Sequence, residues 1–235
     1  MNSPDDLYNK FHPGYFETQK RDLWFYERLW SVLLRQLGKR SSRPTLIEFG
    51  SGPGFLLALA KRYGWHAVGE EPSAVARRHA DKLGVFSTDR GHFVHSRFGS
   101  AIATEVLEHV DYPFESLCEW SAKLVDGGYL AISVPNDNNP LQRLFGRWIS
   151  PDRKTPKHWI HPTHKSYFTP RKLRELVEAA GFDVVWQRTS FPVELLLALP
   201  IPRKLAWKLS RLWPAPPLLW RLNIGRHILL VAKKA

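Results

Sequence analysis

The sequence predicts a single α/β domain, in which a sheet carries helices on both faces. Three observations lead to this prediction: short apolar runs alternate with helical stripes, a glycine-rich turn follows the first apolar run, and an acidic pair ends the second. The chain has 235 residues, of which 43% are hydrophobic and 13% aromatic. A chain of this length can bury roughly 70–75% of the surface that its unfolded form exposes. A folded core is therefore expected.

The first 43 residues predict an N-terminal helical lid. Apolar residues recur at intervals of three and four, which is the spacing of one buried helix face. Gly38 and the run Lys-Arg-Ser-Ser-Arg-Pro after it end the helix. An aromatic cluster at residues 8–16 either packs in the core or lines the mouth of a substrate site. The stripe consists of Leu23, Tyr26, Leu29, Trp30, Leu33, Leu34 and Leu37.

Residues 46–54 read Leu-Ile-Glu-Phe-Gly-Ser-Gly-Pro-Gly and predict a short strand, a turn and the start of a helix. The three glycines remove side chains from a place where a ligand could press against the backbone. Bare amides at a helix start, beside Glu48, suit a nucleotide-type ligand with polar and positive parts. A dinucleotide turn requires Gly-x-Gly-x-x-Gly, but Phe55 stands at its third glycine. A turn that binds no ligand is the alternative.

The second strand is expected at residues 67–69, and the sequence Glu-Glu-Pro-Ser closes it. An acidic side chain at a strand end, about 20 residues after the glycine turn, is placed to accept hydrogen bonds from a ribose diol. A solvated strand end is the alternative. Ser73 is expected to cap the next helix, and residues 84–87 are expected to form the third strand.

Residues 101–110 read Ala-Ile-Ala-Thr-Glu-Val-Leu-Glu-His-Val, and the first four predict a central strand. Glu105, Glu108 and His109 stand at i, i+3 and i+4, so that a helical turn would place them on one face. Two carboxylates and an imidazole can hold a divalent cation. Alternatively, Glu105 lines a ligand pocket while the other two side chains orient the turn.

The second half of the chain continues the alternation of helices and strands. A helix is expected at 113–124, followed by a Gly-Gly turn and a strand that ends in Pro-Asn at 135–136. Thr169 is expected to cap a helix that starts with Pro170 and stops at Gly181. Residues 182–188 and 227–232 are expected to form the last two strands.

Four motifs together closely resemble those of class I S-adenosylmethionine-dependent methyltransferases, including ubiquinone-type O-methyltransferases. They are Glu-x-Gly-x-Gly-x-Gly, Val-Gly-x-Glu-Pro-Ser, Glu-Val-Leu-Glu-His-Val, and the Gly-Gly turn leading to Pro-Asn. The resemblance implies a Rossmann-like sheet of seven strands in the order 3-2-1-4-5-7-6, with strand 7 antiparallel. One departure is Gly99 after Phe98, where the family commonly has Phe-Asp. The expected parts of the single domain 1–235 are a lid (1–43), a cofactor-binding core (44–190), a basic amphipathic insertion (191–226) and the last strand (227–235).

The resemblance also implies a cofactor, S-adenosyl-L-methionine, and candidate site residues. His109 and His164 are the candidate catalytic bases, with His161 as second choice; for His164, a structural hydrogen bond is the alternative. Some relatives bind magnesium at the matching positions, which here are Glu105, Glu108, His109 and His164. The expected cofactor-binding residues are Glu48, Gly50, Ser51, Gly52, Gly54, Glu71 and Glu105.

The net charge of +12 is uneven, because the last 45 residues hold eight Lys or Arg and one Glu. This favours an anionic partner. Leucines and tryptophans interleaved with these bases suit a peripheral membrane contact, closure over an apolar substrate, or a lid on the sheet edge. Nucleic acid is the less favoured partner. The one cysteine, Cys118, suits a reducing cytoplasm.

The expected function is methyl transfer, most simply to an oxygen of a small-molecule or lipid-like acceptor. Two alternatives remain open at this point. The charge would also suit an RNA methyltransferase, and the departure at Gly99 would suit a cofactor-binding protein without catalysis.

Overall fold

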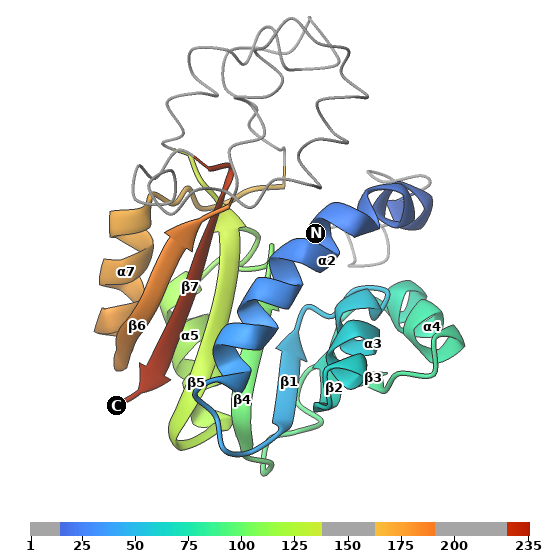
Figure 1. Ribbon diagram of the computed structural model, residues 1–235, viewed down its shortest axis with the longest axis horizontal. Helices are drawn as coiled ribbons and strands as arrows, with labels where there is room; N and C mark the ends of the chain where they lie inside the picture. Colours follow the sequence, from blue (N-terminus) through green and yellow to red (C-terminus); the bar gives the residue numbers. More distant parts are fainter. Residues whose placement is uncertain (1–14, 138–162, 191–224) are drawn as a thin grey trace, which may run out of the picture.

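The computed structural model describes residues 15–137, 163–190 and 225–235, with side chains from residue 23 onward (Figure 1). These residues form a seven-stranded sheet in the order β3-β2-β1-β4-β5-β7-β6. β7 runs antiparallel to both of its neighbours, and the other pairings are parallel. The predicted fold class and strand order are therefore confirmed. The strands are β1 (Thr45–Phe49), β2 (His66–Glu70), β3 (Ser87–Thr88), β4 (Phe98–Thr104), β5 (Leu124–Pro135), β6 (Phe182–Thr189) and β7 (His227–Lys234).

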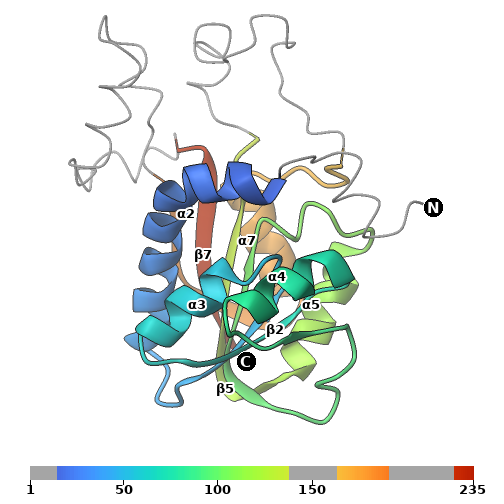
Figure 2. The same cartoon turned by 90° about the vertical axis from the view of Figure 1, so that its right-hand side faces the viewer.

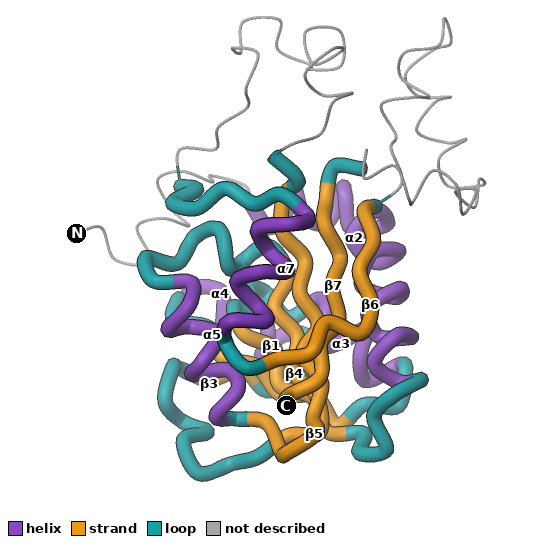
Figure 3. Tube along the Cα trace, turned by 90° about the vertical axis from the view of Figure 1, so that its left-hand side faces the viewer, coloured by secondary structure: helices purple, strands orange, loops and turns teal. Residues whose placement is uncertain are grey.

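Helices cover both faces of the sheet, as Figures 2 and 3 show. One face carries α2 (Tyr15–Gly38) and α3 (Phe55–Arg62), with α4 (Ala74–Lys82) beside β3. The other face carries α5 (Pro113–Ala122) and α7 (Pro170–Ala179). The carboxyl ends of the parallel strands meet along one edge between these two layers, and open α/β sheets bind their ligands at that edge.

The predicted stripe of α2 forms one wall of the core. Leu33, Leu34 and Leu37 are completely or almost completely buried, and Leu29 and Trp30 are buried beside them. They pack with residues of α3, β5 and β7. The aromatic cluster at residues 8–16 lies outside the described side chains.

Both predicted helix caps are present. Ser73 accepts a 3.2 Å hydrogen bond from the Ala76 amide, and Thr169 accepts one of 3.2 Å from the Lys172 amide. Pro170 follows Thr169 at the first helical position, where a missing amide proton costs nothing. The segment just before α7, which carries His164, is held by other bonds, among them the Phe168 amide donating to Oδ2 of Asp137 at 2.6 Å.

Three boundaries differ from the sequence prediction. The expected helix 113–124 ends at Ala122, and the Gly-Gly pair lies inside β5, where Gly127 has a φ of 70°. β3 is a two-residue strand that begins at Ser87, later than expected. Gly99 lies inside β4, and a Cβ there would come within 2.6 Å of the Arg43 Cβ atom. This close approach explains why no aspartate side chain stands at position 99.

In the part of the chain that the structure describes, every helix is too short or too polar to cross a membrane. The predicted basic insertion lies almost wholly outside that part, which resumes at Gly225.

Candidate active site

The glycine turn after β1 is held in a left-handed conformation at three places. Gly50, Gly52 and Gly54 have φ angles of 65°, 50° and 83°, where other residue types are strained by about 1–2 kcal/mol. A Cβ on Gly50 would lie 2.5 Å from Cγ2 of Val106, and one on Gly54 would lie 2.6 Å from Cγ2 of Val85. Protein side chains therefore occupy the space beside these two glycines, whereas the sequence suggested that a ligand would occupy it.

The amides of the turn are not bare, contrary to the sequence prediction. The Gly50 and Ser51 amides donate to the Glu70 carbonyl oxygen at 2.8 and 3.1 Å. The Gly52 amide donates to Oε2 of Glu71 at 2.9 Å, and the Gly54 amide donates to the Ser51 carbonyl at 3.0 Å. The end of β2 thus holds the turn in place before any ligand arrives.

The two acidic residues at the end of β2 take different directions. Glu71 is buried against the turn, and its second oxygen, Oε1, accepts a 2.8 Å bond from the Ser73 amide. Glu70 instead pairs with Lys123, whose Nζ lies 2.7 Å from each carboxylate oxygen. Of the two, Glu71 is the one beside the glycine turn, as the motif resemblance implies for a ribose-binding carboxylate. Ser51 is fixed by a 2.7 Å hydrogen bond between its hydroxyl and that of Ser87.

Glu48 lies inside β1 and is 3% exposed. Burial raises the pKa of its carboxyl well above the usual value, and the nearby charge of Glu71 raises it further. Within the described residues its Oε2 has no hydrogen-bond partner. Buried polar atoms in native proteins almost always have a partner, so this oxygen marks a place for a donor from a bound molecule. An ammonium group beside the turn fits that requirement.

The segment after β4 is a turn rather than the expected helical face. Glu105 has a φ of 56° and is the one non-glycine residue with a left-handed backbone in the described ranges. This backbone directs its carboxylate to Ser133, whose hydroxyl donates to Oε1 at 2.8 Å, and toward His227, whose Nε2 is 3.5 Å from Oε2. The pKa of Glu105 rises to about 7 because burial outweighs the Ser133 hydrogen bond and the Arg226 charge.

Three of the four predicted metal positions lie together. One ligand atom each from Glu108, His109 and His164 falls within 4.8 Å of the others, and Glu105 is not part of this group. The two imidazole ring centres are 4.9 Å apart, and Nε2 of His109 is 3.8 Å from Oε1 of Glu108. The helical turn that would place Glu105 on the same face as Glu108 and His109 does not form.

Glu108 is the least satisfied member of this group. It is 1% exposed, and neither carboxylate oxygen has a hydrogen-bond partner among the described residues. Burial raises its pKa well above the usual value, and the charge of Glu105 adds to the effect. A cation or a protonated imidazole beside it would relieve the unpaired charge.

The segment before α7 brings His164 to this place. The Lys165 and Ser166 amides donate to the Glu108 carbonyl at 2.7 and 3.1 Å, and the Thr163 carbonyl lies 3.1 Å from Nδ1 of His109. His164, the histidine that precedes the helix capped by Thr169, therefore lies beside Glu108 and His109. His161, the second choice, lies outside the described residues.

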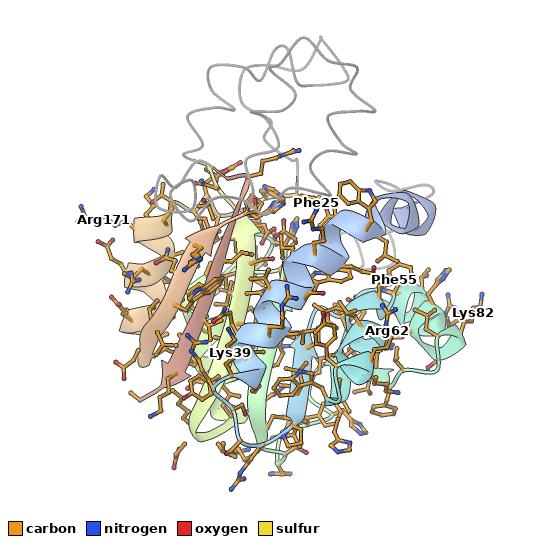
Figure 4. All side chains as sticks on the ribbon, in the orientation of Figure 1. Phe25, Lys39, Phe55, Arg62, Lys82 and Arg171 are labelled. Atoms are coloured by element: carbon orange, nitrogen blue, oxygen red, sulfur yellow. The ribbon has the colours of Figure 1, made fainter. Side chains whose placement is uncertain are left out.

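His227 was missed by the sequence analysis. It is the first residue of β7, and its ring centre lies 5.5 Å from that of Phe25. Figure 4 labels Phe25 on α2. Burial, and then the charge of Arg226, lower its pKa to about 3, so the imidazole is neutral. The signal was the antiparallel direction of the last strand, since an antiparallel strand starts at the edge where the parallel strands end.

Comparison with known proteins places this fold and site in a family. The model of the Methyltransferase domain family matches residues 20–187. The chain belongs to the S-adenosylmethionine-dependent methyltransferases. The family and fold expected from the motifs are thereby confirmed.

Two relatives are both named ubiquinone biosynthesis O-methyltransferase. The chain is 26% identical to that of Aeromonas salmonicida in a match 190 positions long that covers 76% of each chain. It is 29% identical to that of Dinoroseobacter shibae over 153 residues, and this match spans 60% of each chain. Among solved structures, an S-adenosylmethionine-dependent methyltransferase from Archaeoglobus fulgidus superposes with a TM-score of 0.64 at 19% identity, over 94% of this chain and 99% of that one. At that identity the superposition shows the fold.

Proposed function

We propose that this methyltransferase transfers the methyl group of S-adenosylmethionine to an oxygen of a small-molecule or lipid-like acceptor. The observation that carries the proposal is the group of Glu108, His109 and His164 at the end of β4, beside the glycine turn. Glu108 and His109 belong to the Glu-Val-Leu-Glu-His-Val segment that suggested the O-methyltransferases, and the relatives named above are called O-methyltransferases.

The cofactor is proposed to lie along the glycine turn. Glu71 offers a carboxylate to the ribose hydroxyls, and the unpaired Oε2 of Glu48 offers an acceptor to the ammonium group. The Gly52 amide donates to Oε2 of Glu71 and so lies directly beside that carboxylate. When bound, S-adenosylmethionine supplies a methyl group already activated by a sulfonium, so that the protein needs mainly to align the acceptor and exclude water.

An acceptor hydroxyl must lose its proton during the transfer. The imidazoles of His109 and His164 are the proposed bases, because a histidine can accept a proton near neutral pH and both stand beside the buried Glu108 carboxylate. Glu108 would stabilise the imidazolium that forms, since their closest atoms are 3.8 Å apart. This is one role for a carboxylate that otherwise has no partner among the described residues.

The same three side chains would also suit a divalent cation. A carboxylate with two imidazoles is a mixed oxygen and nitrogen set, which suits manganese or zinc better than magnesium, because magnesium prefers oxygen ligands. Such a cation would grip an acceptor oxygen and favour its deprotonated form. Titration calorimetry of the wild type and of Glu108→Gln with Mg²⁺, Mn²⁺ and Zn²⁺ tests this; equal binding by both proteins would contradict it.

The net charge of +12 supports one proposal on partners, peripheral contact with an anionic membrane on which a lipid-like acceptor could be met. Co-sedimentation of the full chain with vesicles that contain phosphatidylglycerol, and not with neutral vesicles, is the expected result. Equal recovery in both pellets would count against membrane contact. Binding to RNA that weakens steeply with added salt would favour the nucleic-acid alternative.

Radiolabelled cofactor tests the reaction itself. We expect label from methyl-labelled S-adenosylmethionine to enter a catechol or phenol with an apolar chain, as an ether that resists mild base. His164→Ala should slow this transfer by 10²-fold or more, which is in the usual range for a general base. Label in RNA would contradict the proposed acceptor. Tight cofactor binding without transfer to any acceptor of the panel would favour the non-catalytic alternative.

A further inference from the structure

A buried ion pair lies at the end of β2; Glu70 fills the variable position of the motif Val-Gly-x-Glu-Pro-Ser, and its partner Lys123 lies outside all four motifs. The Glu70 carboxylate accepts two hydrogen bonds of 2.7 Å from Nζ of Lys123, and both residues are 5% exposed. Lys123 stands between α5 and β5 and also lies 5.5 Å from the centre of the Phe49 ring. Lysine and glutamate are almost never buried unless they are paired. Each therefore depends on the other.

The pair is continued by two further charged residues. Glu119 of α5 lies 3.9 Å from Nζ of Lys123, and its carboxylate accepts hydrogen bonds from both Nε and Nη2 of Arg90. Arg90 follows β3, so this chain of charges links the ends of β2 and β3 across α5. The side chain of Arg90 is 69% exposed, and water screens its contribution.

The contacts return to β2 from the other side. The Arg90 amide donates to Oδ1 of Asp89 at 2.7 Å, and this oxygen lies 3.8 Å from Nη1 of Arg77 on α4. The same Nη1 donates to the Glu71 carbonyl at 2.5 Å. Residues 70 and 71 are thus held on both sides, and the Lys123 contact is the one least screened by water.

Residue 70 connects this pair to the glycine turn. Its carbonyl oxygen receives the amides of Gly50 and Ser51, and the next carboxylate along the chain, Glu71, receives the amide of Gly52. A small displacement of residue 70 would therefore move the turn and the carboxylate of Glu71 together. Both are parts of the proposed cofactor site.

We propose that Lys123 is a positioning residue for the cofactor, acting through Glu70 on the glycine turn and on Glu71. The inference depends on the proposed cofactor role of Glu71 and Gly52. Without Lys123, the Glu70 carboxylate would be buried without a counter-charge, and it would turn toward water. In doing so it would pull on the backbone of residue 70, whose carbonyl accepts the Gly50 and Ser51 amides.

Calorimetric titration with S-adenosylmethionine tests the inference, because the dissociation constant and the binding-competent fraction are measured in one experiment. Lys123→Met should raise the dissociation constant at least tenfold while the stoichiometry stays near one. The double variant Glu70→Leu/Lys123→Met replaces the pair by apolar side chains. Its dissociation constant should be within threefold of the wild-type value. The matched control is Lys82→Met, at the exposed end of α4 (Figure 4), which should leave the constant unchanged.

A merely structural role gives a different result. In that case Lys123→Met would lower the melting temperature or the stoichiometry while the folded molecules kept the wild-type dissociation constant, and the inference would be overturned. If Lys123→Met does not fold, the test uses Glu70→Gln, which keeps the shape of the side chain and removes its charge. A rise in the dissociation constant of threefold or more supports the inference, and an unchanged constant refutes it.

The failure of this inference is distinguishable from a failure of the proposed cofactor site. Weaker binding by Glu71→Gln with unchanged binding by Lys123→Met would overturn the role of Lys123 and leave the site intact. The reverse result would remove Glu71 from the site and support positioning through the glycine turn alone.

Discussion

The turn after β1 and the turn after β4 start alike and end differently. Each follows a buried parallel strand, and each enters a left-handed backbone at once, at Gly50 and at Glu105. In the first turn, the amides of residues 50, 51, 52 and 54 all donate within the protein. The second turn carries Glu108, a buried carboxylate without a hydrogen-bond partner among the described residues.

This difference separates two tasks of one site. The first turn is already organised, so little has to be ordered when a cofactor binds there. The second turn holds a buried carboxylate at Glu108 and a strained backbone at Glu105. Such strain persists only where the surrounding structure enforces it. We infer that the glycine turn holds the cofactor and that the turn after β4 performs the chemistry.

Gly50→Val should have the largest effect on stability. The new side chain would combine a left-handed backbone with a Cβ only 2.5 Å from Val106, a contact that must force one of the two turns to move. We expect the free energy of unfolding to fall by about 3–5 kcal/mol, from backbone strain and overpacking together. Urea denaturation measures it. A loss below about 1 kcal/mol would show that the two turns are not packed against each other as described.

The second largest change in the free energy of unfolding should come from the titration of Glu105. Its folded pKa of about 7 lies above the ordinary value of 4.5, so the folded state binds this proton more tightly than the unfolded state. The resulting stabilisation is present below pH 4.5 and is lost as the pH rises through about 7. The difference corresponds to about 3 kcal/mol at most.

Glu105→Gln isolates this contribution, because glutamine does not titrate. The difference in unfolding free energy between wild type and variant, measured by urea denaturation from pH 4 to pH 8, should change over that window. A difference that stays constant with pH would contradict the raised pKa.

Glu108→Gln should change the free energy of unfolding by less than the two preceding effects, and it should raise that free energy rather than lower it. Removing a buried charge without a partner should stabilise the apo protein at pH 8 by about 1–3 kcal/mol, measured by denaturation in EDTA. Methyl transfer should fall at the same time. A variant less stable than the wild type under these conditions would mean that Glu108 has a partner after all.

The strand order was predictable from the sequence because it depends on motifs that are local in the chain. The glycine turn, the acid at position 71 and the Gly-Gly pair each mark one strand junction, and the family resemblance supplied their order. The helix caps at Ser73 and Thr169 were likewise readable, since a cap involves only its own first turn.

The arrangement of the site residues depends on contacts and backbone conformations that no local sequence pattern predicts. Glu105 leaves the metal group because its backbone is left-handed, and the sequence spacing suggested a helix instead. The pairing of Glu70 with Lys123 joins residues 53 positions apart, and His227 reaches the site from the last strand. The backbone of Glu105 and the pairing of Glu70 with Lys123 required the three-dimensional structure, whereas His227 was within reach of the expected antiparallel direction of the last strand.

The central claim is that the cofactor lies on the glycine turn beside Glu71, and calorimetry with Gly52→Val tests it most directly. Gly64→Val is the matched control, because Gly64 has a φ of 84°, a Cβ there would meet no described atom within 4 Å, and the residue follows α3 at its far end. We expect Gly52→Val to raise the dissociation constant for S-adenosylmethionine by 100-fold or more. Gly64→Val should leave that constant at its wild-type value. Wild-type affinity in a folded Gly52→Val protein would contradict the account.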